Sequence, residues 1–427
     1  MMLRPEPAEL GARHPWPVVV VGCGAAGMLA ALFAARAGVE VLLLETRPKP
    51  GAKIRVSGGG RCNVLPSLMT LDDYHSSGSR NALRNILLSW PLSAVRDFFE
   101  SDLHIPLKTE PTGKVFPQSE QPLDVVEALL DRLARAGAKL AAGVRLTRID
   151  RVDGEHGTRF DLVTAEGRIV HAARVILATG GMSLPKTGSD GAGLAMARRL
   201  GVATVATSPA LVPLLTAEPR WKRLAGVALP ARIRAVQGEH CVDEREREFL
   251  FTHRGFSGPV VLDMSRHVTA VPAADAPAAR LLVRWGGGDA GSWEAALRSS
   301  GKRLITTVLR DRLPERLAEE LVAIAAVPAA RREHELTRAE RRQLLQALDA
   351  FELPAHGNEG YATAEVTAGG VALEAIEPRT LECRAVPGLH VCGEIVDVVG
   401  RIGGYNFLWA WVSGRRAGEA AASLDRS

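Results

Sequence analysis

The sequence contains few cysteines, and their spacing suits neither a metal site nor a disulfide framework. Five cysteines are scattered between positions 23 and 392 of the 427 residues. Their number is odd, and no two of them have CxxC or zinc-ligand spacing. This pattern favours a reduced, cytoplasmic protein and predicts no metal site.

Long apolar runs and an apolar leader segment are also missing. The longest apolar stretch, from Met28 to Leu44, is interrupted by Arg36 and Glu40, so it does not suit a membrane span. The first residues carry two glutamates in place of an apolar segment. We therefore expect a soluble protein with no membrane partner.

Neither sign of charge dominates strongly, and aromatic residues are few, at 5%. The net charge of +5 permits an anionic ligand or RNA without requiring either, and we do not expect DNA as a partner. Hydrophobic residues make up 46% of the chain, which is ordinary for a globular protein. At 427 residues the chain is too long for one hydrophobic core, so we expect two or three domains.

Against this ordinary background, residues 18–45 have a distinctive order. They read VVVVGCGAAGMLAALFAARAGVEVLLLE, which is a valine-rich strand, an alanine-rich helix and a second apolar strand ending at Glu45. Gly22, Gly24 and Gly27 lie between the first strand and the helix with the GxGxxG spacing. Strand, glycines, helix and acid in this order predict a dinucleotide-binding unit.

Each of these residues has a physical role in such a unit. Gly22 permits the tight turn, Gly24 lets a pyrophosphate approach the backbone, and Gly27 lets helix and strand pack closely. The start of the helix offers free N–H groups to the phosphates. Glu45 is spaced to accept hydrogen bonds from a ribose and would repel a 2′-phosphate, so NADP is disfavoured at this site.

Segments far along the chain indicate which dinucleotide binds. RVILATGG at 174–181 and LHVCG at 389–393 are further strands that run into glycines, and a glycine-led helix follows from Gly403. A single nucleotide unit does not need these additions. A cofactor that spans the sheet does, with Asp397 near its ribityl or phosphate end and the last helix at its far end. These segments favour FAD over NAD.

Several longer motifs resemble those of the bacterial HI0933-like FAD-binding oxidoreductases. They are SGGGRCN, TGKVFPQSEQPLDVVEALL, FLFTHRGFSGPVVLDMS, EVTAGGV and CGEIVDVVGRIGGYN, and they follow one another over nearly the whole chain. The resemblance implies a Rossmann-type FAD-binding domain that is interrupted by an inserted domain over the flavin.

The inserted part changes character along its length. Residues 205–265 alternate short apolar runs with turn residues, as in a small β-barrel, whereas residues 292–350 have helical periodicity. Within the latter, Thr337 and Glu340 have the spacing of a capping box. The expected fold is α/β with a GR2-like FAD-binding domain in 1–200 and 355–427, a β-barrel-like insertion in 201–290, and a helical subdomain in 291–354.

The resemblance also implies which residues contact FAD beyond Gly22, Gly24, Gly27 and Glu45. In relatives the SGGGRCN loop lies along the cofactor, which explains three successive glycines. No histidine lies between His14 and His75, so we expect FAD to be bound non-covalently. The implied contact residues are Ala25, Ala26, Thr46, Lys53, Ser57, Gly58, Gly59, Gly60, Arg61, Cys62, Asn63, Leu146, Ala178, Thr179, Gly180, Gly181, Gly393, Glu394, Asp397, Gly403, Gly404, Tyr405 and Asn406.

Four residues are candidates for catalysis: Cys62, His253, Arg401 and Tyr405. His253 could donate a proton to the substrate or cap a turn. Arg401 could orient a carbonyl or carboxylate or neutralise a phosphate. Cys62 could act as a proton donor or thiol partner, or it could be a small residue that fits a crowded loop.

Three functions are compatible with these motifs. The first is flavin-mediated hydride transfer on a small unsaturated or amine substrate, with NAD(P)H as electron donor. No second strand–GxGxxG–helix unit exists, so the donor would use the substrate cleft or dock transiently. The second is a dihydrouridine synthase acting on ribosomal RNA, a reaction to which relatives are linked. The third is a flavin-binding protein with a non-catalytic, partner-binding role.

Overall fold

The computed structural model describes residues 10, 15–154, 157–270, 278–286, 291–298 and 301–423. It divides the chain into two compact units, one of residues 1–207 with 366–427 and the other of residues 208–365. We call them the cofactor unit and the inserted unit. The chain therefore leaves the first unit once and returns once, as a discontinuous domain does.

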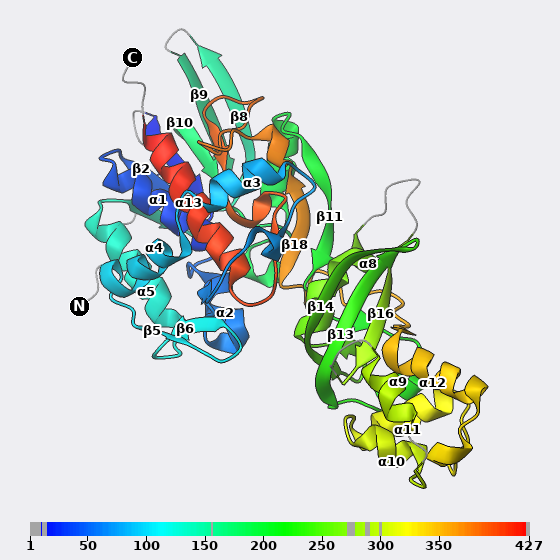
Figure 1. Cartoon of the computed structure of the whole chain (residues 1–427). Helices are drawn as coiled ribbons and strands as arrows, with labels where there is room; N and C mark the ends of the chain where they lie inside the picture. Colours follow the sequence, from blue (N-terminus) through cyan, green and yellow to red (C-terminus); the bar gives the residue numbers. More distant parts are fainter. Residues whose placement is uncertain are drawn as a thin grey trace. The chain divides into compact units, whose positions relative to one another are not determined.

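The cofactor unit is built on a seven-stranded sheet whose middle is parallel (Figure 1). Strands β2, β1, β10 and β19 run in the same direction and β7 extends the parallel part, whereas β9 and β8 form an antiparallel extension. The strands are β7 (Lys139–Ala142), β2 (Val41–Glu45), β1 (Trp16–Val21), β10 (Ile169–Leu177), β9 (Gly157–Thr164), β8 (Leu146–Gly154) and β19 (Leu389–Val391).

The central strand shows why this sequence forms such a sheet. Val18 to Val21 are all buried, because β1 pairs with β2 on one side and with β10 on the other while helices cover its faces. The valine run, the glycine turn and the alanine-rich helix occupy the predicted places. The predicted Rossmann-type α/β fold is confirmed.

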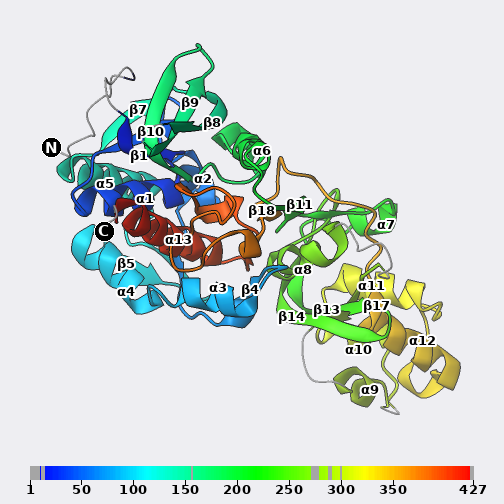
Figure 2. The same ribbon diagram turned by 90° about the horizontal axis from the view of Figure 1, so that it is seen from above.

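Helices α1 and α13 lie side by side in both views, although about 370 residues separate them along the chain (Figures 1 and 2). A Cβ added at Gly414 would overlap the carbonyl oxygen of Ala26, and one added at Gly418 would overlap that of Ala30. The two glycines are four residues apart on α13, and the two alanines are four residues apart on α1. One face of α13 therefore presents glycines to alanines of α1. The helices of this unit are α1 (Ala25–Arg36), α2 (Ala52–Gly60), α3 (Arg80–Leu87), α4 (Leu92–Asp97), α5 (Pro122–Arg135), α6 (Ala192–Arg199) and α13 (Tyr405–Ala422).

Smaller sheets complete the cofactor unit. One has three strands in the order β3-β6-β5, and two others pair one strand from each end of the chain. They are β3 (Leu65–Pro66), β6 (Lys114–Pro117) and β5 (Leu107–Thr109); β4 (Tyr74–His75) with β20 (Val399–Gly400); and β11 (Thr204–Ala210) with β18 (Val366–Val371).

The inserted unit contains a six-stranded sheet with helices at one end of it (Figure 1). In sheet order the strands are β12 (Leu214–Leu215), β15 (Gly255–Ser257), β14 (His240–Phe251), β13 (Ala228–Gln237), β16 (Arg280–Trp285) and β17 (Phe351–Glu352). The helices are α7 (Pro219–Lys222), α8 (Pro259–Thr269), α9 (Ser292–Leu297), α10 (Ile305–Arg310), α11 (Glu315–Ile324) and α12 (Arg338–Asp349).

The sheet of the inserted unit closes as the expected barrel would, but the helices do not form a separate subdomain. The chain that follows β17 runs antiparallel to the other edge strand, β12: Leu214 pairs with Asn358, and the Leu215 N–H donates to the Gly357 carbonyl at 3.0 Å. Trp285 of the sheet and Leu344 of α12 belong to one hydrophobic cluster, because the helices bury their apolar faces against the strands. The boundaries also lie at 207/208 and 365/366, not near 200 and 355. Residues 287–290, near the expected boundary at 290, lie outside the described residues.

The contact between α1 and α13 predicts the effect of one added methyl group. Replacing a helical glycine by alanine normally stabilises a helix by about 0.5–1 kcal/mol. At Gly418 the methyl would overlap backbone, and overpacking costs roughly 1–3 kcal/mol. We therefore expect Gly418→Ala to lower the free energy of unfolding, measured by chemical denaturation. A variant as stable as the parent protein would contradict this packing.

Candidate functional site

The predicted binding residues gather where the parallel strands end. Gly22 follows β1, Glu45 ends β2, Ala178 follows β10, and Gly393 comes two residues after β19. These four strands are neighbours and run in one direction, so their carboxyl ends meet at one edge of the sheet. Nucleotide ligands of open α/β sheets bind at this edge.

The turn after β1 shows which glycines the fold requires and which one a ligand requires. Gly22 has φ +103°, and a Cβ there would lie 2.5 Å from the carbonyl oxygen of Ala178. A Cβ at Gly27 would overlap the carbonyl oxygen of Gly22. Gly24 instead has extended backbone and open space within 4 Å, directly before the first turn of α1. The opening at Gly24 therefore fits a pyrophosphate at the helix N-terminus.

Glu45 is held against this turn by backbone donors. Its carboxylate accepts the N–H of Cys23 at 2.7 Å and that of Arg47 at 2.7 Å. Burial raises the pKa of Glu45, whereas these two hydrogen bonds oppose that increase. The carboxylate therefore lies next to the glycine turn, as a group that accepts ribose hydroxyls requires.

The SGGGRCN loop ends α2 in a run of left-handed conformations. Gly58, Gly59 and Gly60 have φ of +57°, +69° and +81°, a region that strains other residues. A Cβ at Gly58 would lie 2.7 Å from the backbone nitrogen of Asn63. A Cβ at Gly59 or Gly60 would meet no protein atom within 4 Å. The loop's shape requires glycine at all three positions, and two of them are open to a ligand.

Arg61 and Asn63, both implied FAD contacts, also bind other residues of the protein. The guanidinium of Arg61 contacts Glu110 at 2.6 Å and Glu120 at 3.3 Å, and it stacks 4.2 Å from the ring centre of Phe116. The side-chain oxygen of Asn63 accepts the N–H of Val115 at 3.2 Å. Both side chains hold the glycine loop against β6 and against the turns on either side of it.

Cys62 is buried, and its environment opposes a thiolate role. Burial raises the pKa of its thiol to about 12, so the thiol keeps its proton at neutral pH. Its φ of +59° is unusual for a residue other than glycine. The predicted thiol partner is therefore disfavoured, and a small residue fitting a crowded loop describes the position better.

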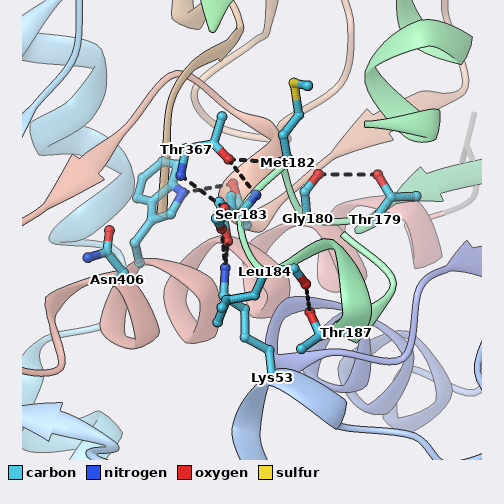
Figure 3. A network of polar contacts seen from close by, with 12 residues as sticks. Lys53, Thr179, Gly180, Met182, Ser183, Leu184, Thr187, Thr367 and Asn406 are labelled. Carbon is cyan, nitrogen blue, oxygen red and sulfur yellow. Dashed lines mark hydrogen bonds and ion pairs between the residues drawn. The ribbon is translucent and has the colours of Figure 1, made fainter. Parts of the chain in front are cut away.

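A polar network joins four distant segments at the same edge of the sheet (Figure 3). The Lys53 ammonium donates to the Ser183 hydroxyl at 2.6 Å and forms an ion pair with Glu394. Glu394 also accepts the Ser183 hydroxyl and the backbone N–H of Thr367, the latter at 3.0 Å. The Thr367 hydroxyl in turn accepts the N–H of Met182 at 2.7 Å. Lys53 and Glu394, both predicted to contact FAD, thus bind each other.

This network fixes the turn that follows β10. Gly180 has φ +72°, and a Cβ there would lie 2.5 Å from the Ser189 hydroxyl oxygen. At Gly181 a Cβ would overlap the Thr367 hydroxyl. Thr179 packs closely against Gly193 at the start of α6. Of the other predicted residues, Leu146 lies buried at the start of β8.

The predicted C-terminal residues surround the start of α13. Asp397 is buried and accepts both the N–H of Ser77, at 3.0 Å, and its hydroxyl. Gly404 precedes α13 with φ +95°, and no side chain caps the helix there. Asn406 makes two bonds of 2.8 Å to the backbone of Gly400. The Asn406 amide therefore shapes this loop at the start of α13, where no side chain of the described residues caps the helix.

The remaining catalytic candidates lie in different environments. Arg401 pairs with Asp73 at 3.1 Å, which secures it to the segment before β4. Tyr405 is half-buried on the first turn of α13, with its ring centre 5.9 Å from that of Tyr74. His253 is exposed on the turn between β14 and β15, in the inserted unit. The structure thus groups Arg401 and Tyr405 with the binding residues in one unit.

Sequence comparison places this architecture in a known group. A model of the HI0933-like protein Rossmann domain matches residues 16–420. The chain belongs to the HI0933-like family. The predicted family is therefore confirmed, and so is the class of enzyme, an FAD-dependent oxidoreductase.

Two curated proteins of this kind are similar over nearly their full length. The 3-dehydro-bile acid delta(4,6)-reductase of Clostridium scindens is 32% identical, over 94% of this chain and 98% of that protein. The ribosomal RNA dihydrouridine synthase of Escherichia coli is 31% identical, over 92% and 95%. Among solved structures, the 3-ketosteroid-delta4-(5alpha)-dehydrogenase of Rhodococcus jostii is 17% identical with a TM-score of 0.47, and the match covers 99% and 100%.

The described part of the chain offers neither a group of residues arranged to hold a metal ion nor a helix long and apolar enough to span a membrane. Two polar residues of the network, Ser183 and Thr367, were missed by sequence reasoning. Thr367 lies in the EVTAGGV motif, and Ser183 comes two residues after ATGG. Their closeness to these motifs was the only feature of the sequence that could have pointed to them. That both residues bind Glu394 is shown only by the structure.

The contrast between Gly24 and Gly27 predicts two different failures. Gly24→Glu should leave the protein folded but without flavin, because the side chain fits the open space and repels the pyrophosphate. Gly27→Val should fail to fold, because its Cβ overlaps backbone. Visible flavin absorbance and circular dichroism distinguish these outcomes. We call the Gly22–Gly27 turn, together with the start of α1, the glycine cradle. Full flavin content in Gly24→Glu would contradict the assignment of this cradle to the pyrophosphate.

Burial also predicts which thiols react. Cys241 is exposed, whereas Cys23, Cys62, Cys383 and Cys392 are buried. At pH 8 a thiol reagent such as Ellman's reagent should modify one cysteine quickly in the native protein, and Cys241→Ser should remove that phase. A fast phase that survives in Cys241→Ser and disappears in Cys62→Ser would show a reactive Cys62.

Proposed function

We propose that the enzyme reduces a carbon–carbon double bond conjugated to a carbonyl in a small molecule. Two observations support this proposal: the open glycine cradle, and the names of the two full-length relatives. A 3-dehydro delta(4,6) substrate carries a ketone conjugated with double bonds, and uridine likewise has its reducible double bond beside a carbonyl. The shared chemistry is reduction of a polarised double bond, which also favours an unsaturated substrate over an amine.

The residues of the cofactor unit fit non-covalently bound FAD. The Gly22–Gly27 turn and the start of α1 would hold the pyrophosphate, and Glu45 would hold the adenosine ribose. The remainder of the cofactor would be held by Gly59, Gly60, Asp397 and the start of α13. When bound, FAD supplies hydride transfer between an electron donor, which we propose to be NAD(P)H, and the substrate.

Reduction of such a double bond also requires a proton beside the carbonyl. Tyr405 is the best candidate donor, because it is half-buried in the same unit as the cradle. Arg401 is held by Asp73, which suits it to orient the substrate carbonyl. His253 is a second candidate donor, on the exposed turn of the inserted unit.

The proposal is tested with purified holoenzyme under anaerobic conditions. NADH or NADPH should bleach the flavin, and a 3-keto-4-ene steroid or cyclohexenone should restore its colour with formation of the saturated ketone. Reoxidation by none of a panel of conjugated carbonyls would contradict the proposal. Turnover of the oxidised enzyme with amines would replace it with amine oxidation. A flavin that no donor reduces would indicate a non-catalytic role.

Replacing Tyr405 should separate the two half-reactions. Removal of a general acid typically slows a step by about 100-fold or more. In Tyr405→Phe we expect slower reoxidation by substrate, with flavin content and reduction by nicotinamide unchanged, in rapid-mixing absorbance measurements. His253→Gln is the comparison variant. If reoxidation slows only in His253→Gln, the proton donor is His253.

Ribosomal RNA is a second candidate substrate, favoured by the name of the relative from Escherichia coli. Electrostatics give this candidate limited support. Residues 208–365 carry 22 Lys and Arg against 21 Asp and Glu, so the inserted unit is nearly neutral. Deleting the gene and measuring dihydrouridine in ribosomal RNA by mass spectrometry decides between the candidates. A loss restored by the intact gene, but not by the Gly24→Glu gene, would establish RNA as the substrate.

A further inference from the structure

A cavity of about 340 Å³ lies beside the C-terminal half of α13, entirely within the cofactor unit. Its lining comes from three segments: the end of α3, the loop before β19, and the last turns of α13. Figure 1 shows α3 beside α13. The lining residues are Ser89, Arg379, Thr380, Arg415, Arg416, Glu419, Ala420 and Ser423.

The cavity is distant from the cofactor cradle. Arg416 comes twelve residues after Gly404 along α13, which corresponds to about 18 Å at 1.5 Å per residue. None of the residues predicted to contact FAD lines it. A ligand of this cavity would therefore be additional to the cofactor.

The lining is cationic, with three arginines against one carboxylate. Arg415 pairs with Glu419 at 2.8 Å and lies over the Trp90 ring at 4.8 Å, so its position is well defined. Arg379 is exposed, and its side chain makes neither a hydrogen bond nor an ion pair with any residue that the structure describes. The charge of Arg379 is therefore available to a ligand.

Arg416 lies close to Arg379 and has part of its guanidinium available. Its guanidinium donates to the backbone oxygen of Arg379 at 2.8 Å and to that of Asn85 at 2.6 Å, which leaves the second terminal nitrogen without a recorded bond. Burial lowers the pKa of Arg416 and repulsion from Arg379 adds to this, whereas attraction to Glu419 and to Glu377 opposes it. An anion between the two guanidiniums would relieve this repulsion.

The helix end beneath the cavity does not cancel the positive charge. A helix C-terminus carries partial negative charge on its last carbonyls, which would disfavour an anion. Here the Arg174 guanidinium covers these carbonyls, with contacts to Ala420 at 3.4 Å, Ala421 at 3.3 Å and Ser423 at 3.0 Å. The cavity therefore combines free cationic donors with a neutralised helix end.

From this arrangement we infer a second ligand site, which binds a phosphate group through Arg379 and Arg416. The Thr380 hydroxyl lines the same cavity and can donate to the phosphate, whereas the hydroxyls of Ser89 and Ser423 donate to the backbone carbonyls of Ile86 and Ala420. The cavity's volume lies at the small end of ligand pockets and suits a phosphate ester of mononucleotide size. The phosphate could belong to a free small ester or to an RNA backbone.

The test uses FAD-loaded protein, because FAD then occupies the pyrophosphate cradle of α1. Isothermal titration calorimetry with inorganic phosphate and with AMP at low salt should show one site that weakens as salt is raised. Arg379→Ala should weaken binding about tenfold or more, since a charge-assisted contact is lost. Arg199→Ala is the matched control, because Arg199 is exposed on α6, outside the cavity.

Each outcome bears on the site. Phosphate affinity that falls in Arg379→Ala but not in Arg199→Ala supports it. Equal affinity in the parent protein and in both variants, or no binding at low salt, overturns it. Competition distinguishes the sources of phosphate. Displacement of phosphate by a short oligoribonucleotide without terminal phosphates assigns an RNA backbone, and displacement by AMP alone assigns a small ester. The result is independent of the reductase assay.

Discussion

The arrangement of the cofactor unit depends on how closely other backbone segments approach α1. At its start the backbone of the first turn lies against the carbonyl of Gly22, and along its length the carbonyls of Ala26 and Ala30 lie against α13. Only glycine permits such contacts, because a Cβ would overlap the neighbouring oxygen. Glycines 27, 414 and 418 therefore hold the turn, α1 and α13 as one block. Since α1 and α13 begin at two of the segments proposed to hold FAD, this packing fixes the starts of both helices relative to each other.

Polar residues at this edge are engaged with one another before any ligand binds. Lys53, Ser183, Thr367 and Glu394 satisfy each other's hydrogen-bonding groups, as partly buried polar side chains require. The result is a site whose turns are held from several directions. Such pre-organisation reduces the ordering that binding would otherwise require.

Charge is distributed unequally between the two units. In the inserted unit, charged side chains pair across strands, as Arg232 does with Glu246 at 2.6 Å. The excess of positive charge belongs to the cofactor unit, where residues 1–207 and 366–427 carry 31 Lys and Arg against 27 Asp and Glu. Most of the net positive charge of the chain therefore belongs to the unit with the glycine-rich turn, and the arginine-rich insertion adds little to it.

Local spacing in the sequence was enough to predict the elements whose geometry depends on neighbouring residues. The strand–glycine–helix unit at 16–36 is of this kind, and so is the capping box in which Thr337 and Glu340 bond each other's backbone. Pro314 lies between α10 and α11 as the N-cap of α11, a position that proline tolerates because it does not need a backbone N–H there. In each case the deciding contacts lie within a few residues, so the pattern contains them.

Tertiary structure alone decided the partners of the charged residues. Arg61 forms an ion pair with Glu110, and Lys53 forms one with Glu394, which is 341 residues away along the chain. The order of the strands in the sheet brings these segments together. Whether the strands of the insertion close into a barrel likewise depended on pairings between distant edges. Sequence spacing thus determined the backbone of the cradle and the family of the enzyme. Contacts between distant segments determined which side chains hold the cradle in place and which remain available to a ligand.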